Sequence, residues 1–343
     1  KNDMLEPLNA IKEFRSSPFV DKVIPDTKVT RRNTPDDTQF DQQWSLNNTG
    51  QSGGTIDADI DAIEAWDIST GGVTPLGDTI VVAIVDGGML LTHADLIPNL
   101  WTNLGEIAGN GIDDDNNGYI DDIHGWNAYS SNGSIPSDGH GTHVAGIVGA
   151  KGNNGTNISG VNWDIKLMAI GGSSGTTSIV LEAYGYVLDQ RAIYDSTGGT
   201  SGAFVVATNS SFGVNNADCN SATYALWNDM YNAMGQYGIL SCGATMNNNS
   251  NVDVTGDVPT GCDSDYMISV TNTTRNDSKN SGAAYGATTI DLGAPGTQIL
   301  STYTGGGTSL LSGTSMATPH VAGAIGFMHA SMSVGLAYLF RTA

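Results

Sequence analysis

The chain of 343 residues contains 13 basic and 35 acidic residues, which gives a formal net charge of −22 at pH 7. This length suffices for one large domain with a buried core and a small appendage. The excess of acids argues against nucleic acid or an anionic membrane surface as a partner, and no apolar run in the sequence approaches the length needed to span a bilayer.

The charge is distributed unevenly along the chain. Residues 1–32 have a net charge of +2, whereas the remaining residues have a net charge of −24. Residues 8–26 combine a helix-like stretch with an extended arm, a pattern that an ordinary N-terminal helix would also give. We therefore expect a boundary between a small segment, 1–32, and a main domain, 33–343.

From Asn33 onward, short apolar runs alternate with helix-like stretches. This pattern predicts an α/β fold of three layers, in which a mostly parallel central sheet has helices on both faces. The predicted strands are 79–86, 165–170, 203–210, 238–244, 267–273 and 298–303. The predicted helices are 140–150, 177–191, 221–236 and 315–329.

The three cysteines are too few and too widely spaced for a zinc site or a disulfide scaffold. Cys242 lies in the apolar run 238–244 and is predicted to be a buried thiol in a strand. Cys219 and Cys262 lie in polar, loop-like surroundings, so we predict that they pair in an oxidising compartment.

Three segments place a reactive side chain at a predicted strand end or helix start. Asp86 ends the run Val-Val-Ala-Ile-Val-Asp, His140 begins His-Gly-Thr-His-Val-Ala-Gly, and Ser315 lies in Gly-Thr-Ser-Met-Ala-Thr-Pro-His. Serine becomes a strong nucleophile when an imidazole takes its proton and a carboxylate orients the imidazole. The three residues are a candidate catalytic triad, although Asp86 alone could cap a turn and His140 alone could be a buried structural histidine.

The chain order Asp, His, Ser and the motifs around these residues resemble the subtilisin family of serine proteases, from about Asn33 to His329. The resemblance implies a subtilisin-like fold and a secreted, extracellular endopeptidase that acts on protein or peptide substrates. It also implies that Ser315 forms an acyl-enzyme, that His140 is the general base and acid, and that Asp86 orients His140.

The resemblance further implies that Asn247 stabilises the oxygen that becomes negative in the tetrahedral intermediate, together with the Ser315 backbone amide. The segment from Gly238 to Asn247 is similar to the family strand that ends in this residue, although Asn247 is also the first of three loop asparagines. Family members usually have small residues just before this position, whereas Thr245 and Met246 stand here.

Substrate is expected to bind in extended form along glycine-containing backbone edges. The alternative is that these segments are ordinary turns after strands. The substrate-binding residues implied by the resemblance are Ser173, Ser174, Gly175, Ser211, Phe212, Gly213, Ala244 and Thr245.

One acidic loop places oxygen atoms at alternate positions around Gly118, as a structural calcium ion requires. The loop resembles the first half of an EF-hand, but His124 stands where the closing glutamate is expected, so Asp121 or Asp122 would complete the shell. A solvated acidic loop is the alternative. The predicted ligands are Asp113, Asp115, Asn117, Tyr119, Asp121 and Asp122.

A second calcium site rests on resemblance to thermitase-like members of the family. The segments Thr34-Pro-Asp-Asp, His93-Ala-Asp-Leu and Asn153-Asn-Gly-Thr-Asn-Ile are similar to segments of those proteins. The implied ligands are the side chains of Asp37, Asp95 and Asn154 and the backbone carbonyls of Thr156 and Ile158.

Residues 8–26 resemble the last helix and strand of a subtilisin prodomain. Residues 1–32 would then be the C-terminal part of an inhibitory prodomain. Family members usually continue with a further helix and a hairpin, so the main domain, 33–343, would either be incomplete at its C-terminal end or have residues 336–343 as a shortened version of that helix. Two alternatives to a general protease remain: a catalytically silent calcium-binding module that keeps the fold, and a protease dedicated to one precursor.

Overall fold

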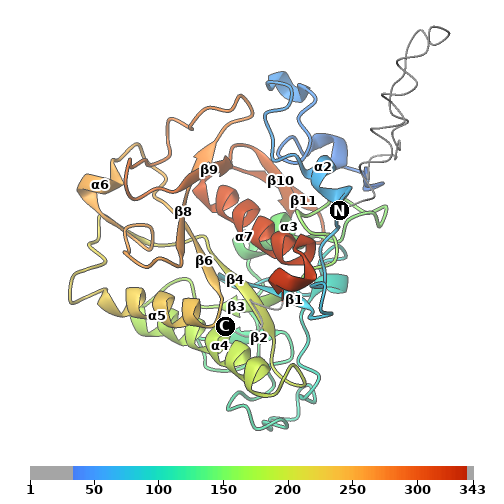
Figure 1. Ribbon diagram of the computed structural model, residues 1–343, viewed down its shortest axis with the longest axis vertical. Helices are drawn as coiled ribbons and strands as arrows, with labels where there is room; N and C mark the ends of the chain where they lie inside the picture. The colour runs from blue at the N-terminus through green and yellow to red at the C-terminus, as the bar shows by residue number, and fades with distance from the viewer. Residues whose placement is uncertain (1–33, 338–343) are drawn as a thin grey trace, which may run out of the picture. The chain divides into compact units, whose positions relative to one another are not determined.

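The computed structural model describes residues 34–337, so the predicted segment 1–32 lies outside the described residues. The centre is a parallel sheet of seven strands in the order β2-β3-β1-β4-β6-β8-β9 (Figure 1). The strands are β1 (Ile80–Asp86), β2 (Gly125–Asn127), β3 (Lys166–Gly171), β4 (Phe204–Ser210), β6 (Leu240–Ala244), β8 (Met267–Thr273) and β9 (Leu292–Pro295).

Helices cover both faces of this sheet, as predicted. The helices α3 (Gly139–Gly149) and α7 (Thr314–Ser331) pack on one face, and α4 (Thr177–Ser196) and α5 (Ala225–Gln236) pack on the other (Figure 1). Shorter helices are α2 (Ala62–Trp66), α6 (Val252–Thr255), η1 (Phe40–Gln42), η2 (Gln51–Gly53) and η3 (Ile97–Asn99). No helix among residues 34–337 is both long enough and apolar enough to cross a membrane.

The alternation of side chains along β1 shows why this strand lies at the centre. Val81, Ala83 and Val85 join the core on the α4 and α5 face, whereas Ile80 and Ile84 join the core on the α3 and α7 face. Successive residues of a strand point to opposite faces, so a strand covered on both sides must be apolar throughout. Only Asp86, at the carboxyl end of β1, breaks this pattern.

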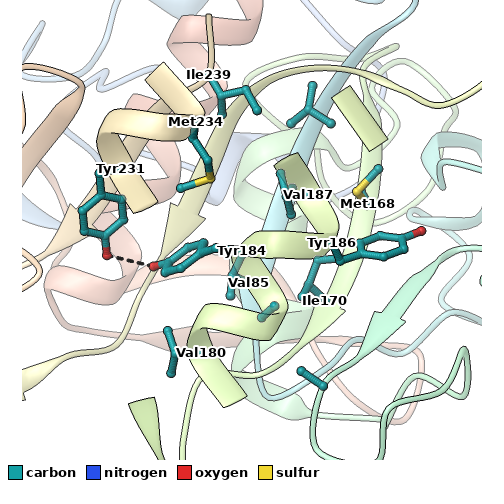
Figure 2. Close-up of a cluster of buried hydrophobic side chains, with 14 of the residues drawn as sticks. Val85, Met168, Ile170, Val180, Tyr184, Tyr186, Val187, Tyr231, Met234 and Ile239 are labelled. Carbon is teal, nitrogen blue, oxygen red and sulfur yellow. Dashed lines mark hydrogen bonds between the residues drawn. The ribbon is translucent and has the colours of Figure 1, made fainter. Parts of the chain in front are cut away.

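The core beneath α4 and α5 contains buried tyrosines whose hydroxyl groups are paired. The Tyr184 hydroxyl lies 3.0 Å from the Tyr231 hydroxyl and 2.7 Å from Ser210 Oγ. Figure 2 shows the Tyr184–Tyr231 pair among aliphatic side chains of the sheet and of α4. Each hydroxyl therefore has a partner, which removes the cost of burying it unpaired.

The prediction of a parallel sheet is confirmed, but the edges differ from the predicted strands. The predicted strand 298–303 is instead β10 (Ile299–Thr302), which pairs antiparallel with β11 (Thr308–Leu311) outside the main sheet. The strands β2 and β9 were not predicted from the sequence. Both are short edge strands, and β9 begins with two exposed residues, so neither has the apolar run that identifies a buried strand.

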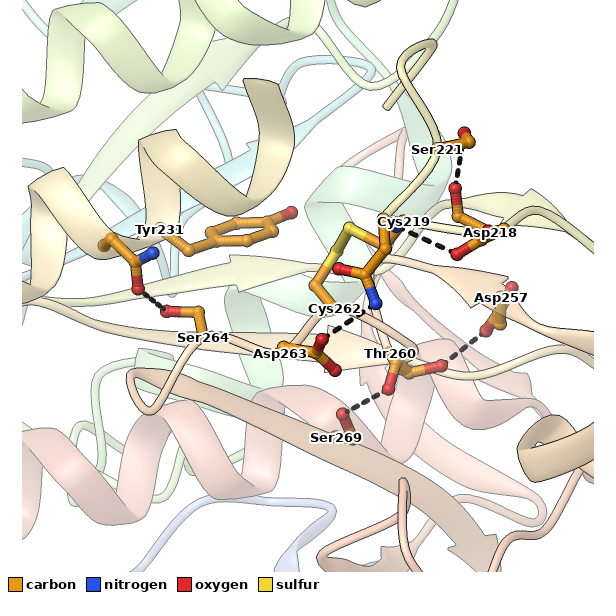
Figure 3. Close-up of a disulfide and its surroundings, with 12 residues drawn as sticks. Asp218, Cys219, Ser221, Tyr231, Asp257, Thr260, Cys262, Asp263, Ser264 and Ser269 are labelled. Carbon is orange, nitrogen blue, oxygen red and sulfur yellow. Dashed lines mark hydrogen bonds between the residues drawn. A yellow bond between two sulfur atoms is a disulfide. The ribbon is translucent and has the colours of Figure 1, made fainter. Parts of the chain in front are cut away.

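The predicted disulfide between Cys219 and Cys262 is present (Figure 3). Cys242 is a free, buried thiol in β6. The disulfide lies beside a two-stranded antiparallel sheet of β5 (Val214–Asn215) and β7 (Asp257–Val258). It links the two ends of a stretch of chain that contains α5, the central strand β6, α6 and β7.

Candidate active site

Asp86 and His140 form the pair that the sequence predicts. His140 Nδ1 lies 2.9 Å from Oδ2 and 3.0 Å from Oδ1 of Asp86, and the Asp86 residue is only 3% exposed. Asp138 caps α3 by accepting a hydrogen bond of 2.7 Å from the Gly141 amide. Gly141 is required here because a Cβ atom at this position would lie 2.0 Å from the Gly88 carbonyl oxygen.

The surroundings of His140 set its protonation behaviour. Burial alone lowers the pKa of His140, but the hydrogen bond and the charge of Asp86, with the charge of Asp138, outweigh burial and raise the pKa above its ordinary value. Because Asp86 occupies Nδ1, the proton-accepting nitrogen of the neutral ring is Nε2.

Ser315 is the second residue of α7, next to the carboxyl end of β4. Its hydroxyl donates to the Ser211 carbonyl oxygen at 3.3 Å, and Ser211 Oγ donates to the Ser315 carbonyl oxygen at 2.9 Å. Among the described residues, no hydrogen bond joins Ser315 to His140. The structure thus pairs two of the predicted triad residues and places the serine hydroxyl against Ser211, in the predicted substrate edge that follows β4.

Asn247 lies beside the start of α7. Its Oδ1 accepts hydrogen bonds of 2.9 Å from the Thr314 amide and 3.2 Å from Thr314 Oγ1. Because Oδ1 is held as an acceptor, the side-chain NH₂ group is left as a donor. The Ser315 amide, in the first turn of α7, has no partner among the described residues, as expected at a helix start.

The two predicted substrate edges flank the end of β1, since β3 and β4 are the neighbours of β1 in the sheet. The first edge begins at Ser173, after β3. The Ser173 amide donates to the Tyr129 hydroxyl at 2.9 Å and to the Asp86 carbonyl oxygen at 3.2 Å, and these bonds fix the edge. The Ser174 hydroxyl also donates to the Tyr129 hydroxyl, at 3.2 Å, and Gly175 adopts a positive φ of 95°. The sequence did not single out Tyr129.

A cavity of about 170 Å³ opens beside Ser315. Its lining includes the predicted residues Ser211, Phe212, Gly213, Ala244 and Thr245, together with Asn247. The predicted nucleophile, the predicted oxyanion donor and one predicted substrate edge therefore share one pocket. Asp257, which the sequence did not single out, also lines this pocket.

The acidic loop gathers carboxylates in part as predicted. Ligand atoms of Glu106, Asp113 and Asp115 lie within 4.8 Å of one another, so these three residues could hold a cation. Glu106 lies before the predicted loop and was not predicted to be a ligand. Asp121 is turned toward the chain before the loop, where its carboxylate accepts from the amides of Asn110 at 3.1 Å and of Gly111 at 3.0 Å.

Asn117 and Tyr119 take different positions around this loop. The Asn117 amide donates to Asp113 and Asp115 at 3.0 Å and 3.1 Å, which places Asn117 with the gathered carboxylates. The Tyr119 hydroxyl donates to Asp189 at 2.6 Å, so only the Tyr119 backbone carbonyl remains to serve as the predicted ligand.

Asp122 is fully buried beneath this loop and has four side-chain partners. Its burial raises its pKa, although the donors around it oppose the shift. The carboxylate is thus hydrogen-bonded both to the loop and to α4, and its role in completing the ligand shell stays a prediction. The donors are Asn103 (2.8 Å), Asn117 (3.1 Å), Tyr186 (2.7 Å) and Gln190 (3.1 Å).

The second predicted metal site is assembled around two buried carboxylates. Asp37 accepts from the amides of Asn153 at 2.8 Å and Asn154 at 3.1 Å. Asp95 lies 3.3 Å from Asn154 Nδ2 and 3.3 Å from the Ile158 amide, and its burial raises its pKa. Asn154 Oδ1 accepts from the Thr156 amide at 2.8 Å. The structure therefore brings together all five predicted residues.

A parallel sheet covered on both faces has an aspartate–histidine pair at the end of β1 and a serine that lines a pocket at the start of α7. This arrangement is typical of a serine-hydrolase type of α/β protein. Residues 77–333 match the model of the subtilase family, and this chain belongs to that family. The predictions of the family and of its fold are thereby confirmed.

Among the relatives, the chain is 32% identical over 277 residues to thermitase of Thermoactinomyces vulgaris, covering 78% of this chain and 79% of thermitase. It is 31% identical over 348 residues to an extracellular protease of Xanthomonas campestris pv. campestris, covering 94% of this chain. The chain spans about half, 54%, of that protease.

Two solved structures are similar in fold. A protease from Pseudoalteromonas arctica PAMC 21717 is 26% identical with a TM-score of 0.61, and the match covers 86% of each chain. A cold adapted subtilisin-like serine proteinase is 24% identical with a TM-score of 0.54, over 83% of this chain and 84% of that one, which supports the fold alone.

Proposed function

We propose that this protein is a secreted serine endopeptidase that hydrolyses peptide bonds through an acyl-enzyme on Ser315. The observation that carries the proposal is the Asp86–His140 hydrogen bond at the end of β1, beside the end of β4, where Ser315 bonds to Ser211 and lines a cavity. The name of the Xanthomonas relative, an extracellular protease, and the Cys219–Cys262 disulfide both favour secretion.

In the first half of the reaction, the Ser315 hydroxyl turns from the Ser211 carbonyl toward His140 Nε2 when substrate binds. Ser315 Oγ attacks the carbonyl carbon of the scissile peptide bond while its proton passes to Nε2. Asp86 stabilises the resulting imidazolium through Nδ1. The C–N bond then breaks, and His140 returns the proton to the leaving amine, which leaves an ester on Ser315.

In the second half, a water molecule gives a proton to His140 and attacks the ester carbon. The C–O bond to Ser315 then breaks, His140 returns the proton to Ser315 Oγ, and the acid product leaves. Both tetrahedral intermediates carry a negative oxygen. The Asn247 side-chain amide and the Ser315 backbone amide are the two donors for this oxygen, and the positive end of the α7 dipole assists them. Both donors are free of other partners in the part of the chain that the structure describes.

Substrate lies between the edges at Ser173–Gly175 and at Ser211–Gly213 as an added extended strand. Residues 1–32 are proposed to inhibit the enzyme as the C-terminal part of its own prodomain. Their net charge of +2 complements the net charge of −24 of the remaining residues, which assists docking and weakens with salt.

Calcium is the structural metal of this proposal. The donor sets consist of carboxylate, amide and carbonyl oxygens, the hard ligands that calcium prefers. Glu106, Asp113 and Asp115 would hold one ion, and the loop around Asp37 and Asp95 would hold the other. Bound calcium would neutralise these gathered carboxylates and so stabilise the native loops.

The test is covalent labelling with a fluorophosphonate probe together with casein hydrolysis. The wild-type protein should be labelled and active, and Ser315→Ala should lose both properties while keeping its melting temperature. Ser331→Ala, an exposed serine at the other end of α7, is the matched control and should behave as wild type. An unlabelled, inactive wild-type protein would instead indicate a silent calcium-binding module.

A further inference from the structure

Asp257 is a buried acid in the pocket that contains Ser315. It begins β7 and pairs with Asn215 of β5, just beyond the substrate edge at Ser211–Gly213. Its residue is 1% exposed, yet it lines the cavity of about 170 Å³ beside the nucleophile. Among the described residues that line this cavity, Asp257 is the only one with a charged side chain.

The partners of Asp257 are all neutral. Its Oδ2 accepts from Thr260 Oγ1 at 2.6 Å and from Thr245 Oγ1 at 3.2 Å, and the amides of Met246 and Val258 also bond to its carboxylate. Figure 3 shows the Thr260 bond. No cation pairs with Asp257 in the described part of the chain. Burial raises its pKa to about 6, so the carboxylate is still ionised at neutral pH.

The surrounding structure holds this carboxylate in place. The Gly261 amide donates to the Asp257 carbonyl oxygen at 2.7 Å, and the next residue, Cys262, is tied by the disulfide to Cys219. Thr245 connects Asp257 to α7, because the Thr245 carbonyl oxygen accepts from Thr314 Oγ1 at 2.5 Å. The position of the Asp257 carboxylate relative to Ser315 is therefore fixed by these bonds and not by a flexible surface loop.

A buried carboxylate without a cationic partner loses solvation that neutral hydrogen bonds restore only in part. A cation that enters the cavity would supply the missing partner, and the reactive serine is at the cavity wall. The side chain that fits this position is the one immediately before the scissile bond. The net charge of −22 also attracts basic peptides from a distance.

We propose that Asp257 makes this enzyme cleave after lysine or arginine. This inference rests on the proposed peptidase function and adds its substrate class. The hydroxyl groups of Thr245 and Thr260 then orient the Asp257 carboxylate that binds the basic side chain of the substrate. A neutral residue in the same pocket would leave the carboxylate buried and unpaired, which is the penalty that creates the preference.

The test compares fluorogenic peptides that differ only in the residue before the scissile bond: lysine, arginine, leucine and glutamate. For the wild-type protein, kcat/KM for lysine or arginine should exceed kcat/KM for leucine by at least about 30-fold. This factor is the lower end of the affinity lost when a buried charge pair loses one partner. Asp257→Asn should remove most of this ratio. Asp263→Asn makes the same charge change at an exposed site shortly after β7 and should alter the ratio by no more than about threefold.

A second measurement covers the case in which Asp257→Asn does not fold. In the wild-type protein, the lysine-to-leucine ratio of kcat/KM should fall as the pH is lowered through about 6, where Asp257 becomes neutral. Protonation of His140 affects both substrates equally and cancels in the ratio. Asp257 has no other ionisable neighbour in the cavity lining, so the ratio reports its charge alone.

The outcomes separate the two proposals. Equal hydrolysis of leucine and lysine peptides by protein that the fluorophosphonate labels would overturn the assignment of Asp257 and leave the peptidase function intact. A ratio that is high but unchanged in a folded Asp257→Asn variant would also overturn it. Absence of both labelling and hydrolysis would refute the peptidase function itself.

Discussion

The oxyanion donor can be tested at Asn247 with a substitution that keeps one of its contacts and removes the other. In Asn247→Asp, a carboxylate oxygen still accepts from the Thr314 amide, which now lies 2.9 Å from Oδ1, but the side-chain NH₂ donor is lost. The start of α7 should therefore keep its position. In Asn247→Ala both the acceptor and the donor are lost.

The expected loss follows from the number of donors. In the proposed mechanism two donors face the developing oxyanion, the Asn247 amide and the Ser315 backbone amide, and the substitution removes only the first. Loss of one such donor typically reduces kcat by about 100- to 1,000-fold, or about 2.7–4 kcal/mol of transition-state stabilisation. KM should change little, because this contact strengthens only in the transition state.

The assay is kcat and KM on one peptide substrate, with the melting temperature measured in parallel. Asn249→Asp adds the same charge at an exposed neighbouring position and serves as the control. Its kcat should remain close to that of wild type. If Asn247→Asp kept the wild-type kcat, or lost activity only through a higher KM, the assignment of Asn247 as an oxyanion donor would be wrong.

Calcium, pH and the N-terminal segment each offer a further test of the proposed enzyme. Excess EDTA should lower the melting temperature, because calcium bound only to the native state at one hundred times its dissociation constant adds about 2.7 kcal/mol; an unchanged melting temperature with verified metal removal would contradict both metal sites. For a neutral substrate, kcat/KM should rise with pH through a pKa above the ordinary histidine value, since Asp86 raises the pKa of His140 and only the neutral ring accepts the proton; Asp86→Asn should move this rise to lower pH. N-terminal sequencing of active protein should find a start near Asn33 that is absent from Ser315→Ala, whereas fully active protein that starts at Lys1 would exclude self-processing.

The residues that sequence alone identifies are those whose chemistry requires a local motif. His140 needs small neighbours on α3, and Ser315 needs a helix start, so each lies in a short recognisable segment. The cysteine pairing was also predictable, because the polarity around Cys219 and Cys262 differs from that around Cys242. In each case the local sequence and the final environment agree.

The features that were missed depend on contacts between distant segments. Glu106 comes close to Asp113 and Asp115 only when the chain before the acidic loop folds back over that loop. Asp122 accepts a hydrogen bond from Tyr186 of α4, which lies far along the chain. Asp257 enters the pocket through pairing of β7 with β5, two strands of two residues each that carry no periodic signal. Such short strands form because the surrounding core and disulfide hold them together.

The position of Cys242 has a consequence for oxidative folding. Three thiols allow three different pairings, and only one of them is native. Cys242 lies in β6 between β4 and β8, fully buried, and this burial raises its pKa. Thiol–disulfide exchange requires an accessible thiolate. Once the central sheet has formed, Cys242 can neither attack the Cys219–Cys262 bond nor be captured by another thiol, so assembly of the sheet itself selects the correct pair.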